Sequence, residues 1–101
     1  MQLAARDHGL TPFVAMENHY NLLYREDERE MIPLCKQMGV SLMPYSPLAA
    51  GRLARPSWDA NILRLKTDVV AKGKYDHTEA QDLEITKRVH ELAEKRQATM
   101  A

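Results

Sequence analysis

The strongest constraint on the fold lies between residues 13 and 43, where two short apolar runs flank an amphipathic stretch. Residues 13–16 are apolar with aromatic and β-branched side chains, which is typical of a buried strand. Apolar residues at helical spacing predict a helix near 31–38, and Gly39 is placed to end it. Residues 40–43 predict a second strand. A strand, a crossover helix and a strand joined by tight connections predict a parallel pair, and hence an α/β fold.

The start of this helix is less clear from the pattern. Asp27 and Glu30 have the spacing of a capping box, but Pro33 lacks an amide hydrogen and fits poorly in a helix that begins that early. We therefore expect the helix to begin near Met31, with Pro33 in its first turn. Before the first strand, residues 1–10 have the pattern of a helix end closed by a glycine.

The second half of the chain predicts a long loop followed by one helix. Residues 45–77 show no steady period, and a connection of that length in a compact domain is usually functional. Thr78 and Gln81 then have capping-box spacing ahead of an apolar stripe, so we expect a helix near 79–96.

Composition excludes several classes of function. The chain has 101 residues and a formal net charge of +0, which removes the basic surface expected of a nucleic-acid binder. No apolar run approaches the roughly 20 residues of a membrane helix, and Arg6 and Asp7 interrupt the segment where a secretory signal would be apolar. We expect a cytoplasmic location, with no membrane or nucleic-acid partner.

The cysteine and histidines do not indicate a reactive centre or a metal site. Cys35 has no second cysteine to pair with, and it lies on the apolar face of its helix, which favours packing over nucleophilic chemistry. His8, His77 and His90 have no partners at metal-ligand spacing, so we expect no metal site.

The segment that opens the long loop has the residue types of a ligand site. It follows the carboxyl end of the second strand, where α/β folds bind ligands. Tyr45 offers a ring to stack on a flat heterocycle, Ser46 a hydroxyl, and Gly51 room for a phosphate to approach the backbone. Arg52 and Arg55 offer positive charge. The alternative is that Tyr45 only caps the strand and the loop only connects.

A polar run follows the first strand in the corresponding place. Glu17, Asn18 and the residues after them would lie on the second edge of the same site, where Glu17 or Asn18 could bond a ligand amide. A solvated strand end, with no ligand role, is an equally good interpretation of this pattern.

Two segments, NHYNLLYRE and YSPLAAGRL, resemble the aldo-keto reductases, in the branch that includes bacterial oxidoreductases and potassium-channel beta subunits. The closing LAEKRQATMA is similar to a further stretch of that family, so the resemblance covers nearly all of residues 1–101. It implies a fragment of a (β/α)8 TIM barrel, covering about the sixth and seventh βα units, because roughly 250 residues are needed for a whole barrel.

The resemblance also implies NADPH as cofactor and an aldehyde or ketone as substrate. Carried over to this sequence, Tyr45 stacks on the nicotinamide, and Glu17 stands where the family usually has the glutamine that bonds the carboxamide. Pro56 stands where relatives place a basic residue, which leaves Arg52 or Arg55 for the phosphates. The implied lining of the pyrophosphate is Ser46, Pro47, Leu48 and Ala49, with Gly51 beside them.

The family's catalytic tyrosine, aspartate, lysine and histidine lie on earlier strands, and the resemblance implies that none of them is in this chain. We therefore assign no catalytic residue and do not expect the chain to turn over alone. The alternatives are a non-enzymatic fragment or interaction module that associates through open sheet edges, including self-association, and an independent small α/β binding domain.

Overall fold

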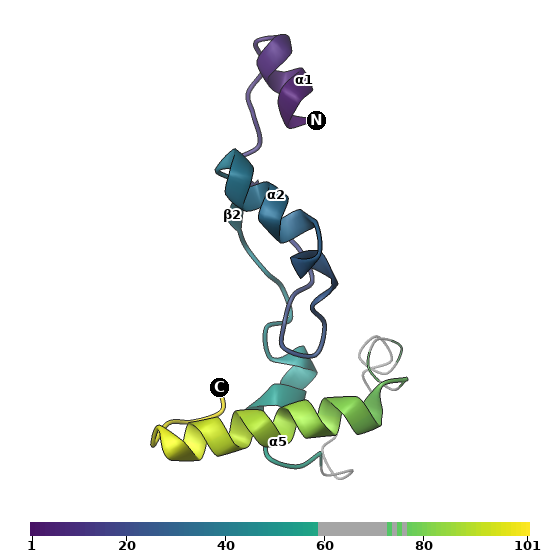
Figure 1. Ribbon diagram of the computed structural model, residues 1–101, viewed down its shortest axis with the longest axis vertical. Helices are drawn as coiled ribbons and strands as arrows, with labels where there is room; N and C mark the ends of the chain where they lie inside the picture. The colour runs from purple at the N-terminus through teal and green to yellow at the C-terminus, as the bar shows by residue number, and fades with distance from the viewer. Residues whose placement is uncertain (59–72, 74, 76) are drawn as a thin grey trace. The chain divides into compact units, whose positions relative to one another are not determined.

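The computed structural model describes residues 1–58, 73, 75 and 77–101. The chain forms two compact units, Met1–Pro47 and Leu48–Ala101. Among the described residues, no helix is both long enough and apolar enough to cross a bilayer. In chain order the first unit contains α1 (Gln2–Asp7), β1 (Ala15–Met16), the 3-10 helix η1 (Glu26–Glu28), α2 (Met31–Met38) and β2 (Ser41–Leu42) (Figure 1).

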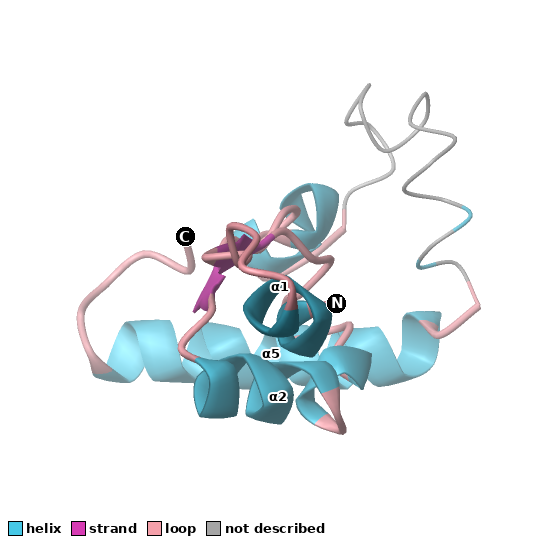
Figure 2. Cartoon of the chain, turned by 90° about the horizontal axis from the view of Figure 1, so that it is seen from above, coloured by secondary structure: helices cyan, strands magenta, loops and turns pink. Residues whose placement is uncertain are grey.

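The sheet of the first unit is a parallel pair, drawn in magenta in Figure 2. Ala15 is paired with Ser41 and Met16 with Leu42. The regular strands are shorter than the expected 13–16 and 40–43, but the backbone pairing extends beyond them. The amides of one segment donate to carbonyls of the other at 2.9, 2.8 and 2.8 Å, in the pairs Ser41 to Val14, Met43 to Met16, and Tyr45 to Asn18.

Pro44 interrupts the second segment without disturbing this pairing. The amides on either side of it, those of Met43 and Tyr45, both point toward the first segment. Because alternate residues of a strand direct their amides to opposite edges, the position of Pro44 faces away from β1, where no hydrogen bond is lost. Tyr45 therefore pairs with His19 in the same register as the two regular strands.

The helix α2 has the bounds expected from its apolar stripe, with Pro33 in its first turn. Gly39 ends it in the left-handed region, at φ 68°, and the Val40 amide closes the last turn on the Cys35 carbonyl at 2.9 Å. Cys35 is buried, at 5% exposure, in accord with a packing role. The capping box considered for Asp27 and Glu30 does not form, because no side chain caps this helix.

The first unit leaves much of its apolar surface uncovered. A groove of about 530 Å³ lies among α1, β1 and α2, lined by Leu3, Phe13, Leu34 and other apolar side chains. Several large apolar residues are more than half exposed, among them Val14 at 72% and Met43 at 60%. The unit therefore gains little of the stabilisation that burial of these side chains would give.

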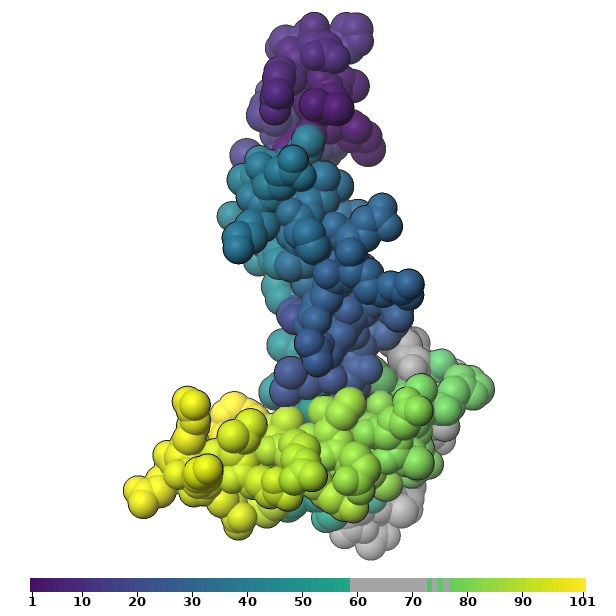
Figure 3. All heavy atoms as spheres, viewed as in Figure 1, coloured from purple at the N-terminus to yellow at the C-terminus, as the bar shows by residue number. Residues whose placement is uncertain are grey.

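The second unit contains the 3-10 helix η2 (Ala49–Ala54) and the long helix α5 (Glu79–Lys95). Within the expected loop 45–77, residues 49–54 form the short 3-10 element η2, which is kinked at Ala50 and Gly51. Of the remainder of that expectation, residues 59–72, 74 and 76 lie outside the described residues. In the space-filling view, α5 is a continuous run of residues coloured from green to yellow (Figure 3).

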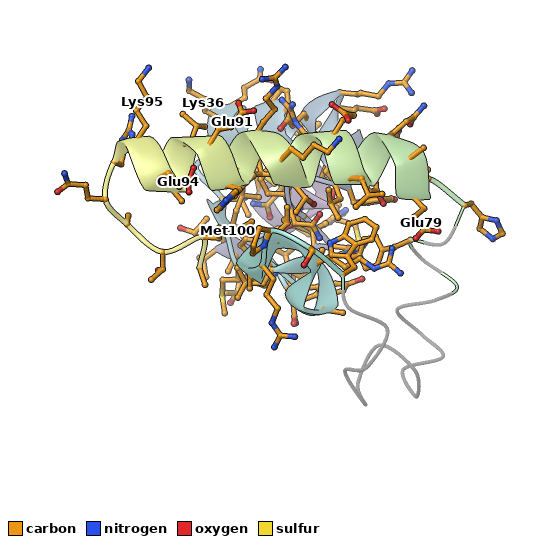
Figure 4. All side chains as sticks on the ribbon, turned by 90° about the horizontal axis from the view of Figure 1, so that it is seen from below. Lys36, Glu79, Glu91, Glu94, Lys95 and Met100 are labelled. Carbon is orange, nitrogen blue, oxygen red and sulfur yellow. The ribbon has the colours of Figure 1, made fainter. Side chains whose placement is uncertain are left out.

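The helix α5 begins where expected but is not capped as expected. The hydroxyl of Thr78 donates to the Asp82 carboxylate at 2.9 Å, and no side chain caps the helix, so the capping box with Gln81 was wrong. Figure 4 shows Glu79 at the start of the helix and Lys95 at its end, an order of charges that suits the helix dipole.

The buried side of α5 is partly polar. Asp82 is 2% exposed and Thr86 is fully buried, with the Thr86 hydroxyl donating to the Asp82 carbonyl at 2.9 Å. That bond satisfies the buried hydroxyl one turn back along its own helix. Ile85 and Val89, from the expected apolar stripe, are only half-buried.

Candidate functional site

The residues expected to bind a cofactor divide between the two units. The first unit carries Glu17, Tyr45, Ser46 and Pro47, and the second carries Leu48, Ala49, Gly51, Arg52 and Arg55. Each group is built by contacts inside its own unit. Among the described residues, no cluster of three histidine, cysteine, aspartate or glutamate side chains has the arrangement of a metal site.

The carboxyl ends of the two paired segments carry a stack of aromatic rings. The parallel register places His19 beside Tyr45, and their ring centroids lie 5.2 Å apart with an interplanar angle of 14°. The His19 ring also stacks on Tyr24, at 4.5 Å and 19°. Tyr45 is 43% exposed, so a planar, partly exposed aromatic ring stands at the end of a parallel strand.

Asn21 joins the two strand ends through its side chain. It is 6% exposed, and its carbonyl oxygen accepts from the backbone amides of Leu23 and Tyr24, both at 2.9 Å. Its amide nitrogen donates to the carbonyl of Ser46 at 2.9 Å. The same nitrogen lies 3.4 Å from Nε2 of His19. One buried amide thus orders the turn after the first strand and the residue that follows Tyr45.

Glu17 and Asn18 have different surroundings. Glu17 is exposed, whereas Asn18 is 4% exposed and its amide nitrogen donates to the Asp27 carboxylate at 2.8 Å. One N–H of Asn18 is therefore engaged inside the unit, while its buried Oδ1 has no hydrogen-bond partner among the described residues. Of the two side chains that the sequence offered to a ligand amide, Glu17 is the accessible one.

A charged network holds the turn that leads into η1. Glu28 accepts from the Tyr20 hydroxyl at 2.5 Å and from Arg25 at 2.8 and 2.7 Å. The hydrogen bonds from Arg25, and then from Tyr20, lower the pKa of Glu28 to about 2. Donation to that carboxylate raises the pKa of the Tyr20 phenol.

The loop at the start of the second unit has an unusual backbone. Ala49 and Ala50 have φ of 49° and 57°, and Gly51 follows at 93°. The left-handed region costs a residue with a Cβ roughly 1–2 kcal/mol. The amides of Gly51 and Leu53 both donate to the Leu48 carbonyl, at 2.9 and 3.2 Å, and these bonds offset part of that cost. The amides of Gly51 and Leu53 are therefore engaged within the turn itself.

The two arginines of this segment differ in accessibility. Arg52 is 7% exposed, and its guanidinium lies 4.7 Å from the ring centroid of Trp58 and 5.4 Å from that of Tyr75. The indole of Trp58 also donates to the Arg52 carbonyl at 3.0 Å. Arg52 therefore has a packing role in this unit. Arg55 is exposed and keeps its charge in solvent.

The sequence analysis did not single out the residues whose contacts organise the predicted segments. His19 and Asn21 lie within the polar run after the first strand, yet only Glu17 and Asn18 were singled out there. The signal for His19 was available in the register, since a parallel pair places it beside Tyr45. The contacts of Asn21 with Leu23 and Tyr24 are a local side-chain turn, which asparagine favours.

Comparison with known proteins gives consistent matches. The family model for the aldo/keto reductase family matches residues 1–101. The chain is 47% identical over 103 residues to an aldo-keto reductase of Alternaria alternata, and this alignment covers 100% of this chain and 27% of that protein. It is 47% identical over 98 residues to an aldo-keto reductase of Metarhizium robertsii, covering 95% of this chain and 26% of that protein.

A third relative is versiconal hemiacetal acetate reductase of Aspergillus parasiticus. This chain is 44% identical to it over 102 residues, which is 100% of this chain and 30% of the relative. The chain thus spans between about a quarter and a third of the length of these curated relatives.

The hydrogen bonds of the buried Asn21 side chain give a prediction for stability. We expect Asn21→Ala to lower the free energy of unfolding by about 1–3 kcal/mol, because buried backbone groups lose their partners. Asn21→Asp keeps an oxygen that accepts from the amides of Leu23 and Tyr24 but loses the N–H that donates to Ser46. The chemical shifts of amides near Ser46 should therefore change more than those near Leu23. Urea unfolding and amide chemical shifts measure both. An unchanged urea midpoint for Asn21→Ala would contradict this role.

The network at Glu28 gives a prediction for pH dependence. A carboxyl whose pKa is lowered from 4.5 to about 2 on folding stabilises the folded state fully above its ordinary pKa, and this stabilisation is lost as the pH falls toward 2. The thermal midpoint of the wild-type chain should therefore fall between pH 5 and pH 2.5 by more than that of Glu28→Gln. Equal falls in the two proteins would show that the Glu28 contacts do not contribute.

Proposed function

This chain belongs to the aldo/keto reductase family, and we propose that it supplies part of a nicotinamide nucleotide site for NADPH-dependent reduction of aldehydes or ketones by hydride transfer. The family implies a (β/α)8 barrel, and we assign the paired strands to about its sixth and seventh βα units. A cytoplasmic location is part of the same proposal. The observation that carries it is the partly exposed ring of Tyr45 at the carboxyl end of a parallel strand.

The surroundings of Tyr45 support a role in stacking on the nicotinamide. Ligands of parallel α/β folds bind beyond the carboxyl ends of the strands, and Tyr45 pairs with His19 at that end of β2. Its ring already stacks on His19. A flat heterocycle laid on an aromatic ring of fixed plane gains stacking energy with little further ordering of the protein.

Glu17 supports a modified contact with the carboxamide of the cofactor. Where the family usually has glutamine, this chain has an exposed carboxylate. A carboxylate accepts a hydrogen bond from the carboxamide NH2 but has no proton to donate to its oxygen. We therefore assign to Glu17 a hydrogen bond from the NH2 group of the cofactor's carboxamide, and none to the carboxamide oxygen.

The second unit supports a role in binding phosphate. The turn at Ala49, Ala50 and Gly51 has no bulky side chain at Gly51, which would let a phosphate approach its backbone. Arg55 is exposed and carries the charge that would attract the phosphate groups, whereas Arg52 is held by its two aromatic neighbours. We assign the pyrophosphate contacts to this turn and to the neighbouring Ser46, Pro47 and Leu48, with Arg55 as the cation.

We assign no catalytic residue to this chain. Carbonyl reduction needs a general acid within hydrogen-bond reach of the carbonyl oxygen, and the family places its tyrosine acid and the groups around it on earlier strands. In the proposed role this chain binds and orients the cofactor but does not by itself complete the reaction.

Binding of NADPH to the 101-residue chain tests this proposal. We expect NADPH to quench the emission of Trp58 in a saturable titration. Stacking of a base on an aromatic residue is worth about 1–3 kcal/mol, so Tyr45→Ala should raise the Kd by roughly 5- to 150-fold. Tyr20→Phe, which removes only the hydroxyl bonded to Glu28, is the matched control and should bind as the wild type does. A flat titration of the wild type up to millimolar NADPH would refute the binding role.

A second candidate function is supported by the uncovered apolar surface of the first unit. The sheet has only two described strands, and Phe13 and Val14, before β1, are 53% and 72% exposed. Pro44 deprives the outer edge of the second segment of a donor, whereas β1 has no proline. In this second candidate, association occurs at the edge of β1. The partner is a second copy of the chain, because a second copy carries the same strand–helix unit. The formal net charge of zero means that two copies do not repel each other through their overall charge.

Sedimentation of the chain over a range of concentrations tests this second candidate. Association through the apolar edge should give dimers or larger species at high concentration, and Val14→Lys should shift them toward monomer. The matched control is Leu92→Lys, which makes the same kind of change at an exposed apolar position (55%) on α5 in the second unit and should leave the dimers in place. A folded monomer with cooperative unfolding at every concentration would rule this function out.

A further inference from the structure

The ring of Tyr45 is held by contacts that reach back to the turn after the first strand. His19 is its partner in the parallel register, and the two rings stack at 5.2 Å with a 14° interplanar angle. His19 in turn stacks on Tyr24 at 4.5 Å. A change in the plane of one ring therefore affects the next.

Asn21 fixes the position of both ends of this stack. Its carbonyl oxygen accepts from the backbone amide of Tyr24, and its amide nitrogen donates to the carbonyl of Ser46, the residue after Tyr45. Its nitrogen also lies 3.4 Å from Nε2 of His19. The three rings and the one buried amide therefore form a connected set.

We propose that His19 is a positioning residue for the cofactor: it sets the plane of the Tyr45 ring on which the nicotinamide stacks. This inference rests on the proposed NADPH site and adds to it a residue that acts on the cofactor indirectly, through the Tyr45 ring. The Tyr45 ring is 43% exposed, and an exposed side chain costs binding free energy when the ligand has to immobilise it. Stacking on His19 removes that cost before the cofactor arrives.

Two substitutions separate ring stacking from mere bulk. His19→Phe keeps an aromatic ring that can stack on both tyrosines and loses the ring nitrogen near Asn21. His19→Leu keeps an apolar side chain in the same place and loses the ring. The first is therefore expected to rescue what the second removes.

The first measurement does not require a cofactor. In a chain with ¹³C-labelled tyrosine, the ring signals of Tyr45, assigned by their loss in Tyr45→Phe, carry a ring-current shift from His19. We expect His19→Leu to move these signals toward the values of a freely rotating tyrosine, and His19→Phe to keep them shifted. Backbone amide signals of α2 report whether the unit remains folded. Unmoved Tyr45 signals in a folded His19→Leu chain would overturn the proposal.

The second measurement is the NADPH titration. We expect His19→Leu to raise the Kd by about two- to tenfold, and His19→Phe to restore it to near the wild-type value. If the wild type binds NADPH and His19→Leu binds it equally well, His19 does not position the cofactor. If no variant binds NADPH, the cofactor site is refuted and the positioning role falls with it. The NMR result then still decides whether His19 holds the Tyr45 ring, so the two failures are distinguishable.

Discussion

The rest of the first unit depends on the backbone hydrogen bonds between the segments that contain β1 and β2. The donors Ser41, Met43 and Tyr45 alternate along the second segment, so the pairing keeps its register past the short regular strands. Because the register is kept, His19 lies beside Tyr45, and the aromatic stack forms at the carboxyl ends. A slip of one residue would direct these side chains to opposite faces and remove the stack. Backbone pairing thus determines the geometry of the candidate site.

The loop that follows the second strand holds conformations that its residues would not choose alone. Ser46, Ala49 and Ala50 all have positive φ, at a cost of roughly 1–2 kcal/mol for each residue with a Cβ. Local contacts compensate: Asn21 bonds to the Ser46 carbonyl, and the Leu48 carbonyl accepts from two amides of the following turn. Strain of this kind persists only where surrounding contacts enforce it, and it is concentrated at ligand-binding segments. Its position here is consistent with the proposed phosphate contacts.

The sequence predicts those parts of the fold that depend on nearby residues. The apolar stripe and Gly39 define α2 because helix packing and a left-handed ending are local properties. Helix caps were predicted less well: Thr78 has the right spacing, but its hydroxyl bonds to the Asp82 carboxylate instead of a backbone amide. The left-handed kink inside η2 was not predicted because alanines give no signal for positive φ. The hypothesis for Tyr45 came from its place after a strand, whereas the role of His19 depends on a partner distant in sequence.

The two arginines show why residue type alone does not assign a phosphate ligand. From the sequence, Arg52 and Arg55 were equivalent cations near a small-residue loop. In the structure the Arg52 guanidinium lies against Trp58 and Tyr75, and moving it to a phosphate would break both ring contacts. An exposed side chain such as Arg55 gives up only its solvation and rotamer freedom on binding. A ring contact with a desolvated arginine is worth about 2 kcal/mol, so the proposed phosphate contact falls on Arg55, which has no such contact to break among the described residues.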